Sequence, residues 1–215
     1  WTGPGASLRG PLLCNLQREV TTVLDDNPRV LVLGIGNILM LDEGVGNRIA
    51  VDLERNYRFP DDVRVMDAGT MGLGMVHLFR GVEFLLVADA VNGTGYDPGT
   101  VVRIPPEEFS PNQVMHSLHD IRFVDVLEAA NLIGLSPRAD CIGVQVEERS
   151  PEEITIGLSP SVEAAVPRAI AAVLTVLEEE GVTAEPNEGQ DADAELQARV
   201  AGQKADIARR QAEGA

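Results

Sequence analysis

The sequence predicts an α/β protein with three layers, in which helices cover both faces of a five-stranded, mostly parallel, twisted sheet. Short apolar runs alternate with amphipathic helical patterns, which is typical of parallel strands buried on both faces. The 215 residues can bury one sizeable core. One connection, residues 92–99, is a polar, turn-rich loop with no room for a helix. Because a parallel crossover needs about a dozen residues or more, the strand after this loop should run antiparallel.

The first strand is expected at Val30–Leu33, a continuous apolar run that ends at the turn Gly34-Ile35-Gly36-Asn37. A helix is expected from about Glu43 to Tyr57, because apolar residues recur there at helical spacing. The other strands are expected at residues 63–66, 83–88, 100–104 and 140–146, and the other helices near 77–79 and at about 119–133 and 161–180.

Three segments of the chain differ in composition. Residues 29–183 contain the whole alternating pattern and are expected to form the single folded domain. Residues 1–28 are expected to be a largely disordered N-terminal extension. Residues 184–215 are acidic, polar and poor in large apolar side chains, so a solvated tail is expected there instead of a second domain.

The charge and the cysteines limit the class of protein. A formal net charge of −17 argues against a nucleic-acid partner, which would need clustered Lys and Arg. No uninterrupted apolar run reaches the roughly 18 residues of a membrane span, and no signal peptide is evident. Cys14 and Cys141 form no C-x-x-C pair, which suits a reducing compartment. The expectation is a cytoplasmic protein without a membrane partner, and a monomer because no apolar helix is left over.

Chemistry is expected at the carboxyl edge of the parallel strands, where ligands bind in open α/β sheets. The first strand leads to Glu43, and the next two strands end at Asp67 and Asp89. The helix before the last parallel strand should begin at this edge, where His119 lies. Such a set suits a divalent transition metal, or equally a carboxylate pair that shares a proton beside a histidine.

Each acidic residue has a simpler interpretation. Asp42 or Glu43 could stabilise the start of a helix, a contribution of about 0.3–1 kcal/mol. Asp67 could be a turn residue that binds nearby backbone groups. Asp89 is harder to explain in this way, because it follows an apolar run and an unpaired buried carboxylate is costly.

The histidines also have simpler interpretations. His119 could cap a helix or lie on the surface, and His116 is its rival for the site. His77 is expected to pack or to face solvent on its short helix.

Other site classes lack their motifs. The turn G-I-G-N resembles the dinucleotide fingerprint G-x-G-x-x-G, but Leu39 occupies the position of the third glycine. The acidic pair after it would also repel a pyrophosphate. Neither a phosphate-loop motif nor a G-x-S-x-G elbow is present. A nucleotide-binding oxidoreductase is therefore disfavoured.

Five motif blocks within about residues 29–182 occur in a distinctive order. They are L-G-I-G-N-I-L-M-L-D-E-G-V-G, M-D-A-G-T-M-G, L-L-V-A-D-A-V, S-L-H-D-I-R-F-V-D-V-L and I-G-L-S-P-S-V-E. Together they resemble the [NiFe]-hydrogenase maturation proteases, endopeptidases that trim the C-terminus of the hydrogenase large subunit. The resemblance implies a phosphorylase/hydrolase-like fold and a grouping with aspartic-type peptidases.

The resemblance also implies roles for particular residues. The metal-contacting triad corresponds to Glu43, Asp89 and His119, and its spacing to the D-V-L block selects His119 over His116. Substrate binding is expected on the turn that corresponds to the family's G-G-T-x-G motif and on the Asp before it: Asp67, Gly69, Thr70 and Gly72. Ala68 replaces the first glycine of that motif. The glycines of the first block are expected to leave room for a partner's chain and metal: Gly34, Gly36, Gly44 and Gly46.

The implied activity is endopeptidase cleavage of a nickel-loaded large-subunit precursor. The nickel belongs to the substrate, and no tightly bound cofactor is expected in the free enzyme. Either Asp89 or Glu43 activates a water as general base, or the metal polarises the carbonyl or the water. The alternative is a non-proteolytic accessory protein that only binds nickel.

Overall fold

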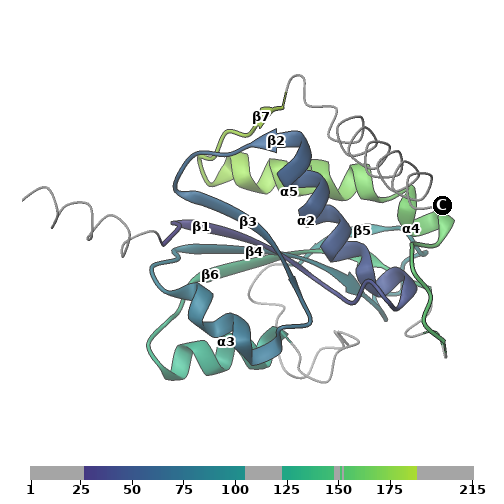
Figure 1. Cartoon of the computed structure of the whole chain (residues 1–215), viewed down its shortest axis with the longest axis horizontal. Coiled ribbons are helices and arrows are strands. Elements are labelled where there is room, and N and C mark those ends of the chain that lie inside the picture. The colour runs from purple at the N-terminus through teal and green to yellow at the C-terminus, as the bar shows by residue number, and fades with distance from the viewer. Residues whose placement is uncertain (1–26, 105–122, 148–150, 152, 188–215) are drawn as a thin grey trace, which may run out of the picture.

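A computed structural model describes residues 27–104, 123–147, 151 and 153–187 (Figure 1). Its main sheet has five strands in the order β3-β1-β4-β6-β5. Four strands are parallel, and β5 runs antiparallel to its neighbour β6. Their bounds are β1 (Val30–Ile35), β3 (Val63–Gly69), β4 (Phe84–Val91), β5 (Val101–Ile104) and β6 (Arg138–Gln145). The predicted fold class, including the single antiparallel strand, is therefore confirmed.

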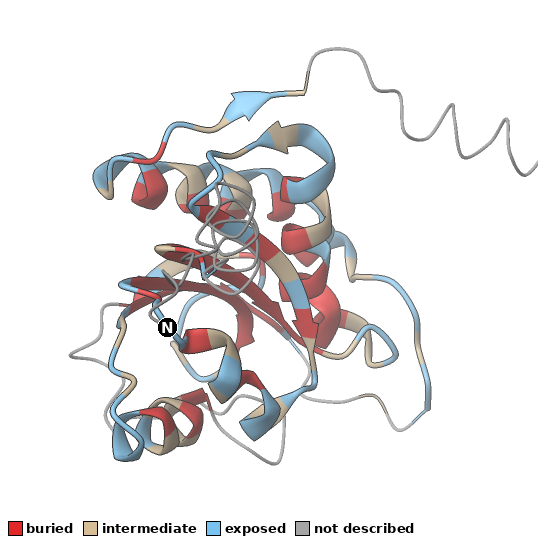
Figure 2. Cartoon of the chain, turned by 60° about the vertical axis from the view of Figure 1, so that its left-hand side comes forward, coloured by how far each residue is buried: buried red, intermediate tan, exposed pale blue. Residues whose placement is uncertain are grey.

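Helices cover both faces of the sheet (Figure 1). The helical elements are η1 (Leu41–Gly44), α2 (Val45–Asn56), η2 (Gly72–Phe79), α3 (Phe123–Leu132), α4 (Pro160–Glu163) and α5 (Val166–Glu179). On one face, α2, α4 and α5 share a core with Val30 and Val32 of β1. On the other face, η2 and α3 share a core with Leu31 and Leu33. Alternation along each strand produces these two apolar layers, and Figure 2 shows the buried sheet between them.

Several element bounds differ from expectation. β4 continues to Val91, so Asp89 lies inside the strand and not after its end. The long helix expected over 161–180 is divided into α4 and α5. The first helix begins at Val45, after the separate 3-10 turn η1. A short pairing joins β2 (Tyr57–Arg58) to β7 (Glu185–Pro186). The expected start of the helix at His119 lies outside the described residues.

By length and composition alone, Pro160–Glu179 is apolar enough to cross a membrane. However, the side chains of its inner face are buried in the core: Val162, Val166, Ala169, Val173, Val176 and Leu177. The segment thus packs as the core helix of an α/β domain.

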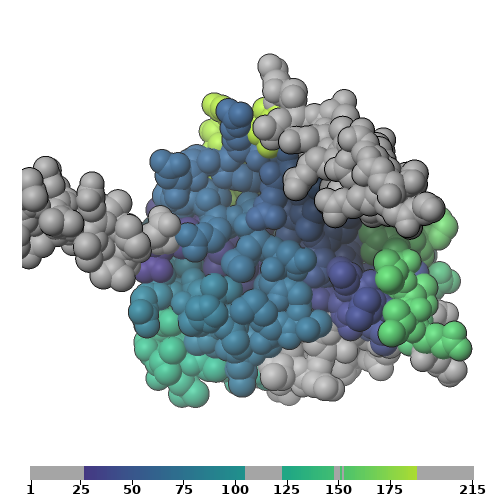
Figure 3. All heavy atoms as spheres, viewed as in Figure 1, coloured from purple at the N-terminus to yellow at the C-terminus, as the bar shows by residue number. Residues whose placement is uncertain are grey.

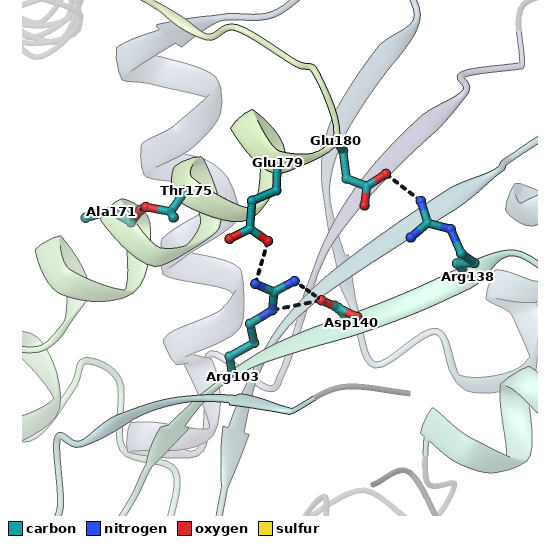
Figure 4. A network of polar contacts seen from close by, with 7 residues as sticks. All are labelled: Arg103, Arg138, Asp140, Ala171, Thr175, Glu179 and Glu180. Atoms are coloured by element: carbon teal, nitrogen blue, oxygen red, sulfur yellow. Dashed lines mark hydrogen bonds and ion pairs between the residues drawn. The ribbon is translucent and has the colours of Figure 1, made fainter. Parts of the chain in front are cut away.

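A polar network fastens the C-terminal end of α5 to the sheet, at the edge where β6 begins (Figure 4). Arg103 of β5 binds Asp140 at 2.6 Å and Glu179 at 2.7 Å. Arg138 binds Glu180 at 2.5 Å and lies over the Phe84 ring. The hydrogen bonds to Glu179 and Asp140 raise the pKa of Arg103. This network belongs to the scaffold, because it lies at the edge opposite the carboxyl ends of the parallel strands.

Candidate active site

Two glycines bring the start of α2 against the ends of β1 and β4. A Cβ atom on Gly34 would lie 2.2 Å from the Gly46 carbonyl oxygen. A Cβ atom on Gly46 would lie 2.1 Å from the Ile35 oxygen and 2.3 Å from the Ala88 oxygen. The expectation that these glycines leave room for a partner is wrong, because the chain's own backbone fills the space. Close helix–strand contact is their function in the fold.

Residues 36–43 form a compact loop that presents the acidic pair. The Asn37 amide donates to the Glu43 carbonyl at 3.1 Å, and the Glu43 amide donates to the Met40 carbonyl at 3.2 Å. A Cβ on Gly36 would lie 2.1 Å from that Glu43 oxygen, so this glycine too is required by the loop itself. Leu41 adopts a φ of 52°, which is unusual for a bulky residue. Such strain is typical of functional loops.

Asp42 has a long-range role. It is only 2% exposed, and its carboxylate accepts a hydrogen bond of 2.6 Å from the backbone amide of Ser159. Ser159 is the N-cap residue of α4. Asp42 does lie in the first turn of a helix, as its interpretation as a helix-start charge requires. Its partner, however, is a segment 117 residues away in the sequence, so Asp42 joins the acidic loop to α4.

Glu43 and Asp89 are both buried at the carboxyl edge, with exposed fractions of 3% and 6%. Glu43 lies on η1, which packs against β4. Asp89 accepts a hydrogen bond of 2.8 Å from the Ala90 amide. The structure thus brings these two predicted carboxylates to one edge of the sheet. Carboxylates that are buried at one edge of a sheet favour a bound cation or a proton near them.

Asp89 lies on the face of the sheet that η2 and α3 cover. It alternates along β4 with the same period as Leu85 and Val87, which belong to the core layer on that face. In that layer, burial, and after it the charge of Asp89, raise the pKa of the Cys141 thiol. His119, the third predicted ligand, lies outside the described residues, as does its rival His116. Within the described residues no cluster of three His, Cys, Asp or Glu side chains could hold a metal.

Asp67 makes one local and one long-range hydrogen bond. Its Oδ1 accepts from the Gly69 amide at 2.8 Å and from the Asn47 side chain at 2.5 Å. Gly69 and Gly72 have φ values of 50° and 53°, which favour glycine. The Gly69 carbonyl also accepts from the Gly36 amide at 3.2 Å, so this turn lies directly beside the acidic loop. The expected local backbone bond of Asp67 is present, although Asp67 lies inside β3. Substrate binding by Asp67, Gly69, Thr70 and Gly72 stays a prediction.

Asn47 is a buried polar residue that contacts the predicted site residue Asp67, and it is absent from the sequence-based predictions. It is 4% exposed, its Nδ2 donates to Asp67, and its Oδ1 has no hydrogen-bond partner among the described residues. The available signal was its position three residues before Ala50, on the inner side of α2. A polar residue on an apolar face needs a partner.

His77 and Gln145 are two further polar residues with defined contacts. His77 is exposed and its Nδ1 contacts the Gly74 carbonyl, as expected for a solvent-facing residue. Gln145, at the carboxyl end of β6, accepts hydrogen bonds from the amide and hydroxyl of Thr94 at 3.2 and 2.5 Å. Gln145 thereby fastens the loop between β4 and β5 to the same edge.

Two solved structures that are similar to this chain are endopeptidases. The hydrogenase maturating endopeptidase HybD from Escherichia coli is 37% identical, with a TM-score of 0.62 over 74% of this chain and 98% of that chain. The solution structure of an endopeptidase from Escherichia coli is 37% identical and has a TM-score of 0.66 over 75% of this chain and 99% of that chain. The structure is thus similar to endopeptidases with an α/β fold.

The sequence comparisons identify the family. The hydrogenase maturation protease family model matches residues 47–176. The hydrogenase 2 maturation protease of Escherichia coli (strain K12) is 38% identical over 164 residues, which are 74% of this chain and 97% of the relative. The hydrogenase expression/formation protein HupM of Azotobacter chroococcum mcd 1 is 40% identical over 76% of this chain and 78% of the relative. The chain belongs to the hydrogenase maturation protease family.

Proposed function

We propose that this protein is the endopeptidase that removes a C-terminal peptide from the nickel-loaded precursor of a [NiFe]-hydrogenase large subunit, as a late step of hydrogenase maturation. The observation that supports this most strongly is the buried pair Glu43 and Asp89 at the carboxyl edge of a chain that belongs to the maturation protease family. The match to nearly the whole length of the Escherichia coli hydrogenase 2 maturation protease also supports it.

Nickel enters this proposal as part of the substrate. Two carboxylates and the imidazole of His119 would provide a mixed oxygen and nitrogen ligand set that suits a divalent transition metal. Three ligands leave the coordination shell incomplete, so the precursor would provide the rest. Glu43 and Asp89 suit this role because both carboxylates are buried at one edge of the sheet, where a bound cation would stabilise their charged forms.

The chain can contribute to bond cleavage in two ways. In the first, Asp89 or Glu43 takes a proton from the attacking water, which would agree with the aspartic-type grouping that the family resemblance implies. In the second, the carboxylates only position the substrate's metal, and that metal polarises the carbonyl or the water. Asp89→Asn keeps the shape of the side chain but removes its charge and basicity. Cleavage should be lost in both cases.

Incubation of the purified protein with nickel-loaded precursor, followed by intact-mass measurement, tests the proposal. The expected result is a precursor shortened by one C-terminal peptide, with no shortening by Asp89→Asn. Stoichiometric nickel binding by the protein, without any shortening, would instead favour the non-proteolytic nickel-binding accessory protein. Retained cleavage by Asp89→Asn would remove Asp89 from the site.

The setting of the reaction is also part of the proposal. A net charge of −17 supports a protein partner over nucleic acid. We propose that the protein acts as a monomer in the cytoplasm, without membrane attachment. Sedimentation of the purified chain at several concentrations tests the oligomeric state.

A further inference from the structure

Exposed apolar side chains gather on two paired segments at the carboxyl edge. Residues 38–41 and 153–156 lie side by side in parallel, because the Leu41 amide donates to the Thr155 carbonyl at 2.7 Å and the Thr155 amide donates to the Leu39 carbonyl at 2.9 Å. We call these two segments the apolar ribbon. Figure 3 shows dark blue atoms of the segment between β1 and α2 adjoining the green segment that precedes α4.

Four large apolar side chains of the ribbon are open to solvent. Their exposed fractions are 56% for Ile38, 42% for Leu39, 71% for Ile154 and 76% for Ile156. Ile154 and Ile156 flank Thr155, which forms an isolated parallel β-bridge with Met40, so both side chains should lie on the side opposite that of Thr155. A single exposed apolar residue is ordinary, but four exposed apolar side chains on two hydrogen-bonded segments are a concentration typical of surfaces that bind a partner.

The ribbon is continuous with the proposed catalytic edge. Leu39 precedes Glu43 by four residues, so their Cα atoms are at most about 14 Å apart. The hydrogen bond from the Ser159 amide to Asp42 joins the second segment to the same acidic loop. A polypeptide placed at Glu43 and Asp89 would therefore reach the ribbon within about four of its own residues.

We propose that the apolar ribbon is the docking surface for an apolar segment of the large-subunit precursor next to the bond that is cut. This inference rests on the proposed function, because the partner is the protease's own substrate. Continuity with the carboxylates favours the precursor over a second copy of this chain. Two copies would also repel each other, since each has a net charge of −17.

The test is the double variant Ile154→Ser/Ile156→Ser, with Leu132→Ser/Ile133→Ser as a matched control. The control residues are also apolar and exposed, at 87% and 66%, and they lie at the end of α3 before β6 begins, at the opposite edge of the sheet. Binding of the nickel-loaded precursor is measured by calorimetry and cleavage by intact mass. In the ribbon variant, Kd and KM should each rise roughly tenfold to a hundredfold. In the control variant they should stay within about twofold.

A conservative variant and a folding measurement separate docking from damage to the fold. Ile154→Val/Ile156→Val should bind within about threefold of the wild type, because most of the apolar surface remains. Thermal unfolding of both serine variants should match, since all four side chains are exposed. Equal loss of binding in the ribbon variant and the control would overturn the inference, as would loss of a wild-type dimer in the ribbon variant alone.

The two proposals fail in different ways. A wild-type protein that cleaves the precursor, together with a ribbon variant of unchanged Kd, overturns the docking surface and leaves the proposed function standing. A wild-type protein that binds the precursor without shortening it overturns the proposed function, while its Kd still tests the ribbon. A wild-type protein with no measurable binding to the precursor overturns both.

Discussion

Replacing Gly46 by alanine should increase the distance between Glu43 and Asp89. The new Cβ would lie 2.1 Å from the Ile35 oxygen and 2.3 Å from the Ala88 oxygen. Non-bonded carbon and oxygen atoms keep roughly 3.3 Å apart, so the start of α2 must withdraw by about 1 Å. Both oxygens belong to strands of the central sheet and cannot move independently. Glu43 on the preceding turn would then move away from Asp89.

The magnitude follows from two opposing effects. Overpacking against rigid backbone costs about 1–3 kcal/mol, and the gain in helix propensity from glycine to alanine returns up to about 1 kcal/mol. A net loss of about 1–2 kcal/mol should lower Tm by roughly 2–8 °C in a domain of this size. A misplacement of about 1 Å can also reduce the rate of cleavage by about a hundredfold.

Thermal unfolding and precursor cleavage measure these two effects. Gly74→Ala is the control, because its Cβ would make only ordinary contacts of 3.9–4.0 Å with Met71. The control should keep its Tm within about 2 °C and its cleavage rate within about twofold. If Gly46→Ala behaved like this control in both measurements, close helix–strand contact would not be what positions Glu43.

Three other predictions follow from named contacts. Asn47→Leu removes the donor to Asp67 but also the unpartnered Oδ1, so the free energy of unfolding measured by chemical denaturation should fall by only about 1 kcal/mol. The loss should be larger for Asn47→Asp, which places two carboxylates together. Asp42→Ala leaves the Ser159 amide without its partner and should cost about 1–3 kcal/mol, whereas a stability equal to wild type would contradict the link to α4. Burial raises the pKa of the Cys141 thiol, so the folded state keeps a proton that the unfolded state loses above about pH 8.5. The contribution of the Cys141 thiol to the free energy of unfolding should thus be fully present below that pH and should fall above it by up to about 1.4 kcal/mol per pH unit. Cys141→Ala should flatten this part of the pH profile.

The sheet could be predicted because its signals are local. Continuous apolar runs identified β1 and β4, and the short loop of residues 92–99 required an antiparallel β5. The ends of the helices and strands were harder to predict. Nothing in the residues around Asp89 distinguishes the last residue of a strand from one inside it, since the extension of β4 to Val91 depends on pairing with β6.

The site could be predicted only in part, for the same reason. Topology and the motif order bring Glu43 and Asp89 to one edge, and both are found there, buried. The bonds from Asn47 to Asp67 and from Ser159 to Asp42 join residues 20 and 117 positions apart. No periodicity or motif specifies such pairs. The sequence indicates that the glycines of the first motif stand where space is needed, but it does not indicate which atoms fill that space. The expected partner is therefore replaced by the chain's own backbone.

The proposed function depends on recognition of a metal in the substrate by Glu43 and Asp89. The most direct measurement is the intact mass of the large-subunit precursor after incubation with this protein, with nickel-loaded and nickel-free precursor in parallel. The prediction is that the nickel-loaded form is shortened by one C-terminal peptide and the nickel-free form keeps its full mass. Cleavage of both forms at the same rate would contradict the account.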